Sequence, residues 1–120
     1  MINGLAHVAL YTNKFEETID FYKRIFEGQE IERFYTDKRG CNMQLGSFIM
    51  EIFEVNQTLE DGVFKHIALS CDNVDEIYYK AISEGAEPYV APKDVDMKMI
   101  KRIAFVKGIN KEQIEFCELK

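Results

Sequence analysis

The chain has 120 residues, the length of a single domain, and 47% of them are hydrophobic, enough to form a sizeable core. A net charge of −6 with scattered Lys and Arg disfavours binding to a nucleic-acid backbone. No apolar run is long enough to span a membrane, and the N-terminal residues lack the pattern of a secretory signal. The three cysteines are odd in number and fit no C-x-x-C spacing, so we expect free thiols in a cytoplasmic protein.

The first half of the chain predicts a strand, a helix and three further strands. Residues 6–10 are apolar and β-branched at alternate positions, as in a strand. Residues 15–26 predict a helix, with Asn13 as its N-cap, Glu16 three residues later, and Gly28 as the left-handed residue after its end. The following strands are predicted at 30–36, 41–45 and 48–55, separated by 37–40 and by Gly46.

The second half predicts the same order of elements. Residues 65–69 form the strand, and residues 74–84 form the helix, with Asn73 and Glu76 as the cap pair and Gly85 after its end. Three further strands are predicted at 87–90, 99–106 and 113–119, separated by 92–96 and by 108–110.

The two halves are therefore repeats with a period near 59 residues, most visible in the echo of residues 6–10 by residues 65–69. Each repeat reads β-α-β-β-β, and one such unit has an apolar sheet face that it cannot bury alone. We expect an α+β fold: one domain, residues 1–120, built from two tandem βαβββ modules of about 1–57 and 62–120. Their curved mixed sheets would enclose a cavity, with modules paired within a chain or between chains.

Four ionisable side chains occupy matched positions of the repeat. His7 and His66 are the only histidines, and both lie in the first strand of a module, on the face turned away from the helix. Glu51 and Glu115 lie in the last strand of each module, between apolar neighbours, and alternation turns both toward the cavity. We therefore expect two imidazoles and two carboxylates to converge.

A lone carboxylate in apolar surroundings is costly, whereas a divalent cation bound by all four groups would offset that cost. Imidazole plus carboxylate suits Zn, Ni, Co, Mn or Fe. Taken singly, a strand histidine is more often a hydrogen-bonded core residue, and a strand glutamate more often faces solvent. The matched placement of all four favours a metal site formed by His7, Glu51, His66 and Glu115.

These segments, taken together and in order, resemble the vicinal oxygen chelate superfamily, and within it glyoxalase I (lactoylglutathione lyase). The resemblance covers nearly the whole chain and is carried by residues 7–10 leading into 19–22, 49–52, 66–70, and 104–108 running to 113–116. In glyoxalase I a His and a Glu of each module bind the metal, and those positions match His7, Glu51, His66 and Glu115. Iron-dependent dioxygenases of the superfamily use a two-His, one-carboxylate pattern in longer chains, so the complete set favours a lyase or isomerase.

The resemblance implies a mechanism. A divalent metal would chelate two adjacent oxygens of a thiol–methylglyoxal hemithioacetal. Ni, Co and Zn are the first choices for this metal, followed by Mn and Fe. Glu115 or Glu51 would remove the carbon-bound proton as the general base, and its return at the neighbouring carbon would give a thioester. Of the two, Glu115 is our choice.

Some family positions differ in this chain. Glyoxalase I has an arginine four residues after the first ligand histidine, where this chain has Tyr11; Val55 replaces an asparagine, and residues 107–111 replace the usual D-P-x-G turn. The glutathione-binding pattern is therefore not kept, and the thiol stays open. Tyr11 and Ser70 would line the cavity with polar ends and are candidates for binding cofactor or substrate.

Other activities fit the same resemblance. One alternative is another vicinal oxygen chelate enzyme, such as an acyl-CoA epimerase or a thiol transferase that acts on an antibiotic. A second alternative is a non-enzymatic protein that sequesters a small ligand such as an antibiotic. A small-molecule partner is common to all of them. The family also implies a homodimer, in which modules pair within one chain or across two.

Overall fold

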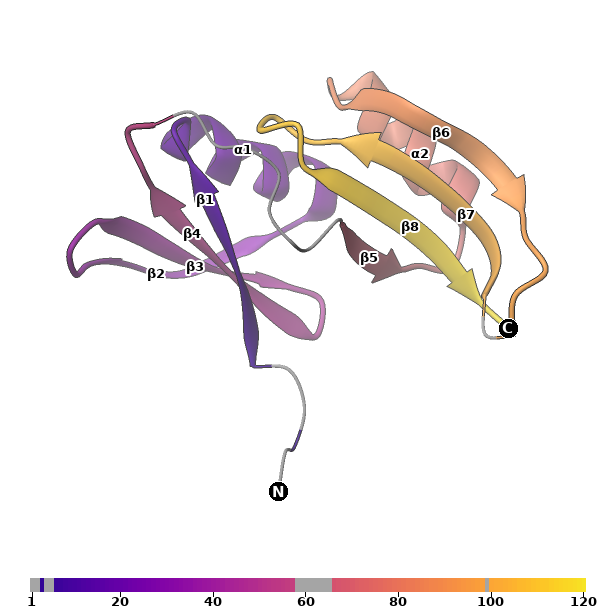
Figure 1. Ribbon diagram of the computed structural model, residues 1–120, viewed down its shortest axis with the longest axis horizontal. Coiled ribbons are helices and arrows are strands. Elements are labelled where there is room, and N and C mark those ends of the chain that lie inside the picture. Colours follow the sequence, from indigo (N-terminus) through magenta and orange to yellow (C-terminus); the bar gives the residue numbers. More distant parts are fainter. Residues whose placement is uncertain (1–2, 4–5, 58–65, 99) are drawn as a thin grey trace. The chain divides into compact units, whose positions relative to one another are not determined.

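The computed structural model describes residues 3, 6–57, 66–98 and 100–120. They belong to two compact units, Met1–Glu60 and Asp61–Lys120. Each unit contains one helix and one four-stranded mixed sheet in the order βαβββ (Figure 1). The predicted α+β class and its two βαβββ modules are confirmed.

Unit 1 is built around a sheet with the strand order β1-β4-β3-β2. Strand β1 is parallel to β4, and the other two pairs are antiparallel. Helix α1 connects β1 to β2 and packs chiefly against β4. The elements are β1 (His7–Thr12), α1 (Phe15–Phe26), β2 (Gln29–Tyr35), β3 (Arg39–Leu45) and β4 (Phe48–Glu54).

Unit 2 repeats this topology with the strand order β5-β8-β7-β6. Strand β5 is parallel to β8, and helix α2 packs against β6, β7 and β8, covering one face of the sheet (Figure 1). The elements are β5 (Ile67–Ser70), α2 (Val74–Ser83), β6 (Glu87–Asp94), β7 (Ile100–Lys107) and β8 (Gln113–Leu119).

The core of each unit lies between its helix and its sheet. In unit 1 the apolar stripe of α1, including Ile19, Tyr22 and Ile25, is fully buried, as are Met50 and Ile52 of the central strand β4. Burying a side chain of this size stabilises the fold by roughly 1.5–3 kcal/mol. The opposite face of each sheet is not covered by a helix of its own unit, and this open face carries the candidate site.

The predicted N-cap of the first helix is wrong. Helix α1 begins after Lys14, not after Asn13, and no side chain caps its N-terminus. Two threonines fix the start instead: Thr12 Oγ1 accepts a hydrogen bond from the Lys14 N–H (2.8 Å) and lies 3.0 Å from Thr18 Oγ1. Thr18 Oγ1 in turn donates to the carbonyl of Lys14 at 2.6 Å.

The end of α1 also differs from the prediction. The left-handed residue is Glu27, with φ 57°, and not Gly28. A Cβ on Gly28 would lie 2.6 Å from Met43 Sδ, so a larger residue there would displace a core side chain. The second helix follows its prediction: Asn73 Oδ1 accepts a hydrogen bond from Glu76 N–H at 3.0 Å, and Gly85 has φ 105°.

Strand β6 is longer than the predicted strand 87–90, because it continues to Asp94 through Pro92. As β6 is an edge strand, a proline there removes no hydrogen bond that the sheet needs. Register shifts on either side of Val90 accommodate the irregular segment.

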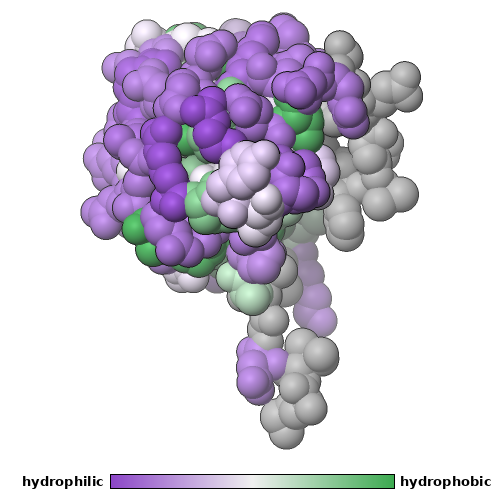
Figure 2. Space-filling model, turned by 90° about the vertical axis from the view of Figure 1, so that its left-hand side faces the viewer, coloured by the Kyte–Doolittle hydropathy of each residue, from purple (hydrophilic) through white to green (hydrophobic). Residues whose placement is uncertain are grey.

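The surface on the side of the β2–β3 hairpin is predominantly hydrophilic, with only small apolar areas between charged side chains (Figure 2). In the part of the chain that the structure describes, no helix is long and apolar enough to cross a membrane.

Candidate metal-binding site

The open faces carry the side chains that the alternation predicts. Along β1, His7, Ala9 and Tyr11 are exposed, whereas Val8 and Leu10 are partly buried. In β8, Ile114 and Phe116 are only 1% exposed, and Glu115 lies on the opposite face, as expected.

In unit 1 the sheet register brings His7 and Glu51 together. Strand β1 is parallel to β4, with Ala9 directly opposite Glu51, so His7 is the preceding residue on the same face. His7 Nε2 lies 2.9 Å from Glu51 Oε1, and the two side chains are 48% and 22% exposed. The pair is thus accessible from the open face.

Unit 2 repeats this pair in the same register. Ala68 of β5 lies opposite Glu115 of β8, and His66 precedes Ala68 on the same face. His66 Nε2 lies 3.3 Å from Glu115 Oε1, and the side chains are 39% and 10% exposed. The ring of Phe105 contacts the imidazole edge-on, with centroids 5.3 Å apart. Each unit therefore presents one imidazole and one carboxylate in equivalent positions.

The spacing within each pair fits two ligands of one metal ion. Two ligand atoms that are each about 2.1 Å from an ion and at right angles to one another lie about 3.0 Å apart. The observed separations of 2.9 Å and 3.3 Å bracket that value. Among the described residues, no group of three or more His, Cys, Asp or Glu side chains that could hold an ion is found. Each unit by itself offers one imidazole nitrogen and one carboxylate as candidate ligands.

The two residues predicted to bind a cofactor or substrate also lie on the open faces. Tyr11 is 47% exposed and contacts Phe53 edge-on at 5.6 Å. Lys38 Nζ lies 5.9 Å from the centroid of the Tyr11 ring. Ser70, at the end of β5, lines a cavity of about 320 Å³ in unit 2. The other lining residues are Cys71, Asp72, Lys101, Glu118 and Leu119.

Sequence reasoning missed one residue beside the pair of unit 1. Asn42 of β3 lies directly opposite Glu51 on the open face. Its Oδ1 is buried without a hydrogen-bond partner, and its Nδ2 lies 3.5 Å from Glu32 Oε1. A buried acceptor without a donor is costly, so Asn42 offers a position for a donor group of a bound molecule. Only the pairing of β3 with β4, which the sequence does not encode locally, reveals this neighbour.

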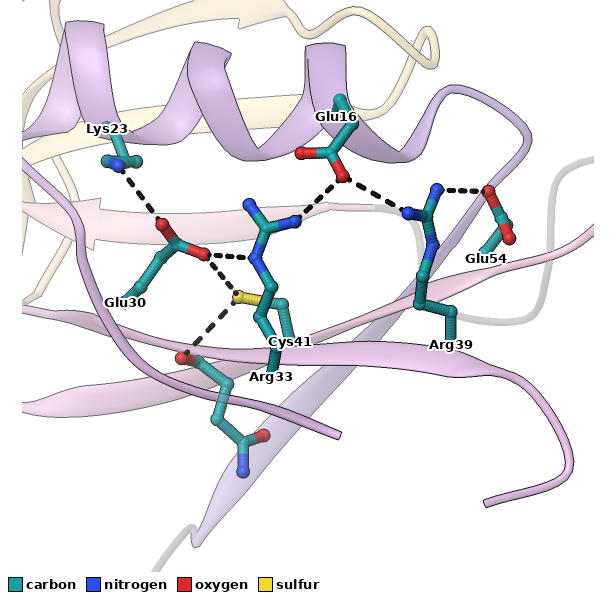
Figure 3. A network of polar contacts seen from close by, with 8 residues as sticks. Glu16, Lys23, Glu30, Arg33, Arg39, Cys41 and Glu54 are labelled. Carbon is teal, nitrogen blue, oxygen red and sulfur yellow. Dashed lines mark hydrogen bonds and ion pairs between the residues drawn. The ribbon is translucent and has the colours of Figure 1, made fainter. Parts of the chain in front are cut away.

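A separate polar network lies on the helix-facing side of unit 1 (Figure 3). Arg33 donates to Glu30 Oε1 at 2.6 Å and to Glu16 Oε2 at 2.7 Å, and Lys23 Nζ lies 3.1 Å from Glu30 Oε2. Hydrogen bonds from Arg33 and then Lys23 lower the pKa of Glu30 to about 2. Burial raises the pKa of the neighbouring Cys41 thiol to about 11. The network joins α1 to the sheet, and its thiol is inert at neutral pH.

Two βαβββ units, each with a His–Glu pair at the same register of an open sheet face, define a protein of the paired-module, vicinal oxygen chelate type. A family model described as Glyoxalase/Bleomycin resistance protein/Dioxygenase superfamily matches residues 4–115. The chain belongs to this superfamily, whose description spans two classes of enzyme and a resistance protein.

Solved structures share the fold over nearly the whole chain. The fosfomycin resistance protein FosX from Listeria monocytogenes is 21% identical, with a TM-score of 0.81 over 98% of this chain and 94% of that chain. A FosX variant in complex with Mn(II) and 1S,2S-dihydroxypropylphosphonic acid is 19% identical, with a TM-score of 0.81 over 98% and 93%. TioX from Micromonospora sp. ML1 is 16% identical, with a TM-score of 0.76 over 97% and 98%. No curated protein sequence matches the chain significantly.

Proposed function

We propose that the chain is a divalent-metal-dependent lyase or isomerase of the vicinal oxygen chelate type. His7, Glu51, His66 and Glu115 would hold one ion, with Ni, Co, Zn or Mn as the expected metals. When bound, the ion would polarise two adjacent oxygens of a small substrate. The observation that carries this proposal is the recurrence of one His–Glu pair, at one register, in both units.

The role of the histidines follows from their donor chemistry. Neutral imidazole offers one nitrogen lone pair, and in both units Nε2 is the atom next to the carboxylate. Phe105 packs against the His66 ring and limits its rotation, which orients that nitrogen without a hydrogen bond. These contacts support a metal-ligand role for both rings.

Glu115 is our choice for the general base. Its side chain is 10% exposed and that of Glu51 is 22% exposed, so water competes less for the Glu115 carboxylate. In the proposed reaction, Glu115 takes the proton from the carbon that bears the sulfur and the hydroxyl group of a thiol–methylglyoxal hemithioacetal. It then returns this proton to the neighbouring carbon, while the hydroxyl proton passes to the oxygen of that neighbouring carbon, and the product is a thioester. Glu51 would serve chiefly as a ligand.

A second candidate is the modification of a phosphonate antibiotic. It is favoured by the shared fold with FosX over 98% of this chain, together with the Mn(II) and dihydroxypropylphosphonic acid bound by one FosX variant. For this chain, the reaction would be addition of water across the epoxide of fosfomycin. A water proton would pass to a glutamate, and the opened epoxide oxygen would take up a proton.

One experiment separates the two candidates. The protein loaded with Ni, Co, Zn or Mn is incubated with methylglyoxal plus glutathione or another low-molecular-weight thiol, and in parallel with fosfomycin, with products followed by ¹H and ³¹P NMR. We expect thioester formation, and the Glu115→Gln variant should lose about 10²-fold or more of the rate while retaining most of its metal. Hydrolysed fosfomycin without thioester would establish the second candidate, and turnover of neither substrate by metal-loaded protein would contradict both.

A further inference from the structure

The open face of unit 2 carries a lysine that the roles assigned above do not use. Lys107, the last residue of β7, lies opposite Gln113 of β8, which shares its face with Glu115. The lysine is partly buried, and its Nζ lies 4.6 Å from the centroid of the Tyr89 ring. A cation is thus held over an aromatic ring, on the same sheet face as the His66–Glu115 pair.

No carboxylate of the described residues neutralises this ammonium group. Glu87 is opposite Lys107 in the register of β6 with β7, but Glu87 Oε2 lies 3.2 Å from Nζ of a different lysine, Lys111. Among the described residues, Lys107 forms no ion pair. The face of Tyr89 attracts the charge, but it does not satisfy the three N–H donors of an ammonium group.

Aromatic side chains connect the lysine to the histidine. Phe105 lies between them, with its ring centroid 6.1 Å from that of Tyr89 and 5.3 Å from that of His66, and both contacts are edge-on. The apolar ring offers a surface for the carbon chain of a ligand. A polar group bound at His66 and Glu115 and a second one at Lys107 would therefore lie at the two ends of one apolar strip.

Lys107 lies two strands from the position of His66, about 10 Å between backbones at about 4.8 Å per strand. A ligand that contacts both groups therefore extends across the sheet face. Since the chain carries a net charge of −6, an anionic ligand also needs a local cation to offset long-range repulsion.

We propose that Lys107 binds an oxyanion carried by the substrate, a carboxylate, phosphonate or phosphate. The substrate is therefore an acid, and in a thiol–methylglyoxal hemithioacetal the thiol part would carry the oxyanion. This inference rests on the proposed function, because the two adjacent oxygens are placed at the ion held by His66 and Glu115.

The test uses the full chain loaded with Mn(II), whose paramagnetism broadens the NMR signals of a nearby ligand. The probes are 3,4-dihydroxybutanoate and glycerol 3-phosphate, with butane-1,2-diol and glycerol as their neutral counterparts. We expect the wild-type protein to bind each anion at least about tenfold more tightly than its neutral counterpart, as for a hydrogen bond to a charged group. Lys107→Met should remove this preference, and Lys107→Arg should retain it.

Lys111→Met is the matched control, because Lys111 is a nearby exposed lysine that already pairs with Glu87. It should leave the preference for anions unchanged. A wild-type protein without the preference, or a Lys107→Met variant that keeps it, would overturn the proposal. If the wild-type protein binds no Mn(II), the proposed function itself fails. In that case the same ligands are titrated into metal-free protein, and the NMR signals of the Tyr89 and Phe105 rings report whether the anions bind near Lys107.

Discussion

His7 and His66 show how far single residues can be predicted. Their place on the open faces follows from strand alternation alone, and so do the places of Glu51 and Glu115. Alternation does not predict which atoms these side chains contact. The 2.9 Å contact of His7 with Glu51 depends on the parallel register of β1 with β4, which is a property of two strands distant in the sequence. For the same reason, neither Asn42 beside Glu51 nor Phe105 beside His66 could be predicted from the sequence.

Glu30 gives a prediction at the residue scale. Its pKa in the folded protein is about 2, below its ordinary value of 4.5. The carboxylate therefore stabilises the fold fully above pH 4.5, and this stabilisation is lost as the pH falls from 4.5 toward 2. Glu30→Gln should lower the free energy of unfolding at pH 7 by about 1 kcal/mol and flatten its decline between pH 4.5 and 2.

Urea denaturation at a series of pH values measures this effect. Glu17→Gln is the control, because Glu17 is an exposed residue of α1, the helix that the network joins to the sheet. It should change neither the stability at pH 7 nor its slope with pH by a measurable amount. If Glu30→Gln and the wild-type protein lose stability in parallel over this range, the network in Figure 3 does not act through Glu30.

At the scale of elements, both helices were predicted from their apolar stripes, and their ends were predicted with unequal success. The Asn73–Glu76 pair caps α2 because Asn73 immediately precedes its first residue. The similar Asn13–Glu16 pair does not cap α1, because Lys14, which the buried Thr12 and Thr18 hydroxyls engage, is the residue that precedes the helix. The capping motif therefore predicted the cap only where no hydrogen bonds of neighbouring side chains competed with it.

This difference predicts unequal effects of the same substitution. Asn73→Ala should lower the free energy of unfolding by about 1 kcal/mol, because it leaves the Glu76 N–H without its acceptor. Asn13→Ala should change it by less than about 0.5 kcal/mol, since Asn13 is exposed and caps nothing. Equal losses in thermal or urea denaturation would show that Asn13 also supports its helix.

For the whole molecule, the repeat was the most informative feature of the sequence. It predicted two βαβββ modules, and the two sheets confirm them with matching strand orders and matching His–Glu registers. Each module leaves an open sheet face that carries one His–Glu pair. The repeated pattern does not predict how the modules pair. A module has an equally suitable partner in the other half of its own chain and in a second copy of the chain. The proposed single ion shared by the two pairs is therefore a claim about assembly as well as chemistry.

The number of metal ions bound per chain tests this claim most directly. It is measured by elemental analysis after loading with Ni or Mn and removal of excess metal, for the wild-type protein and for His7→Ala and His66→Ala. A site shared by both modules predicts one ion per chain in the wild-type protein, whether the modules pair within or between chains. Both variants should then lose nearly all of their metal. Two ions per chain in the wild-type protein, with one retained in each variant, would show independent half-sites and contradict the account.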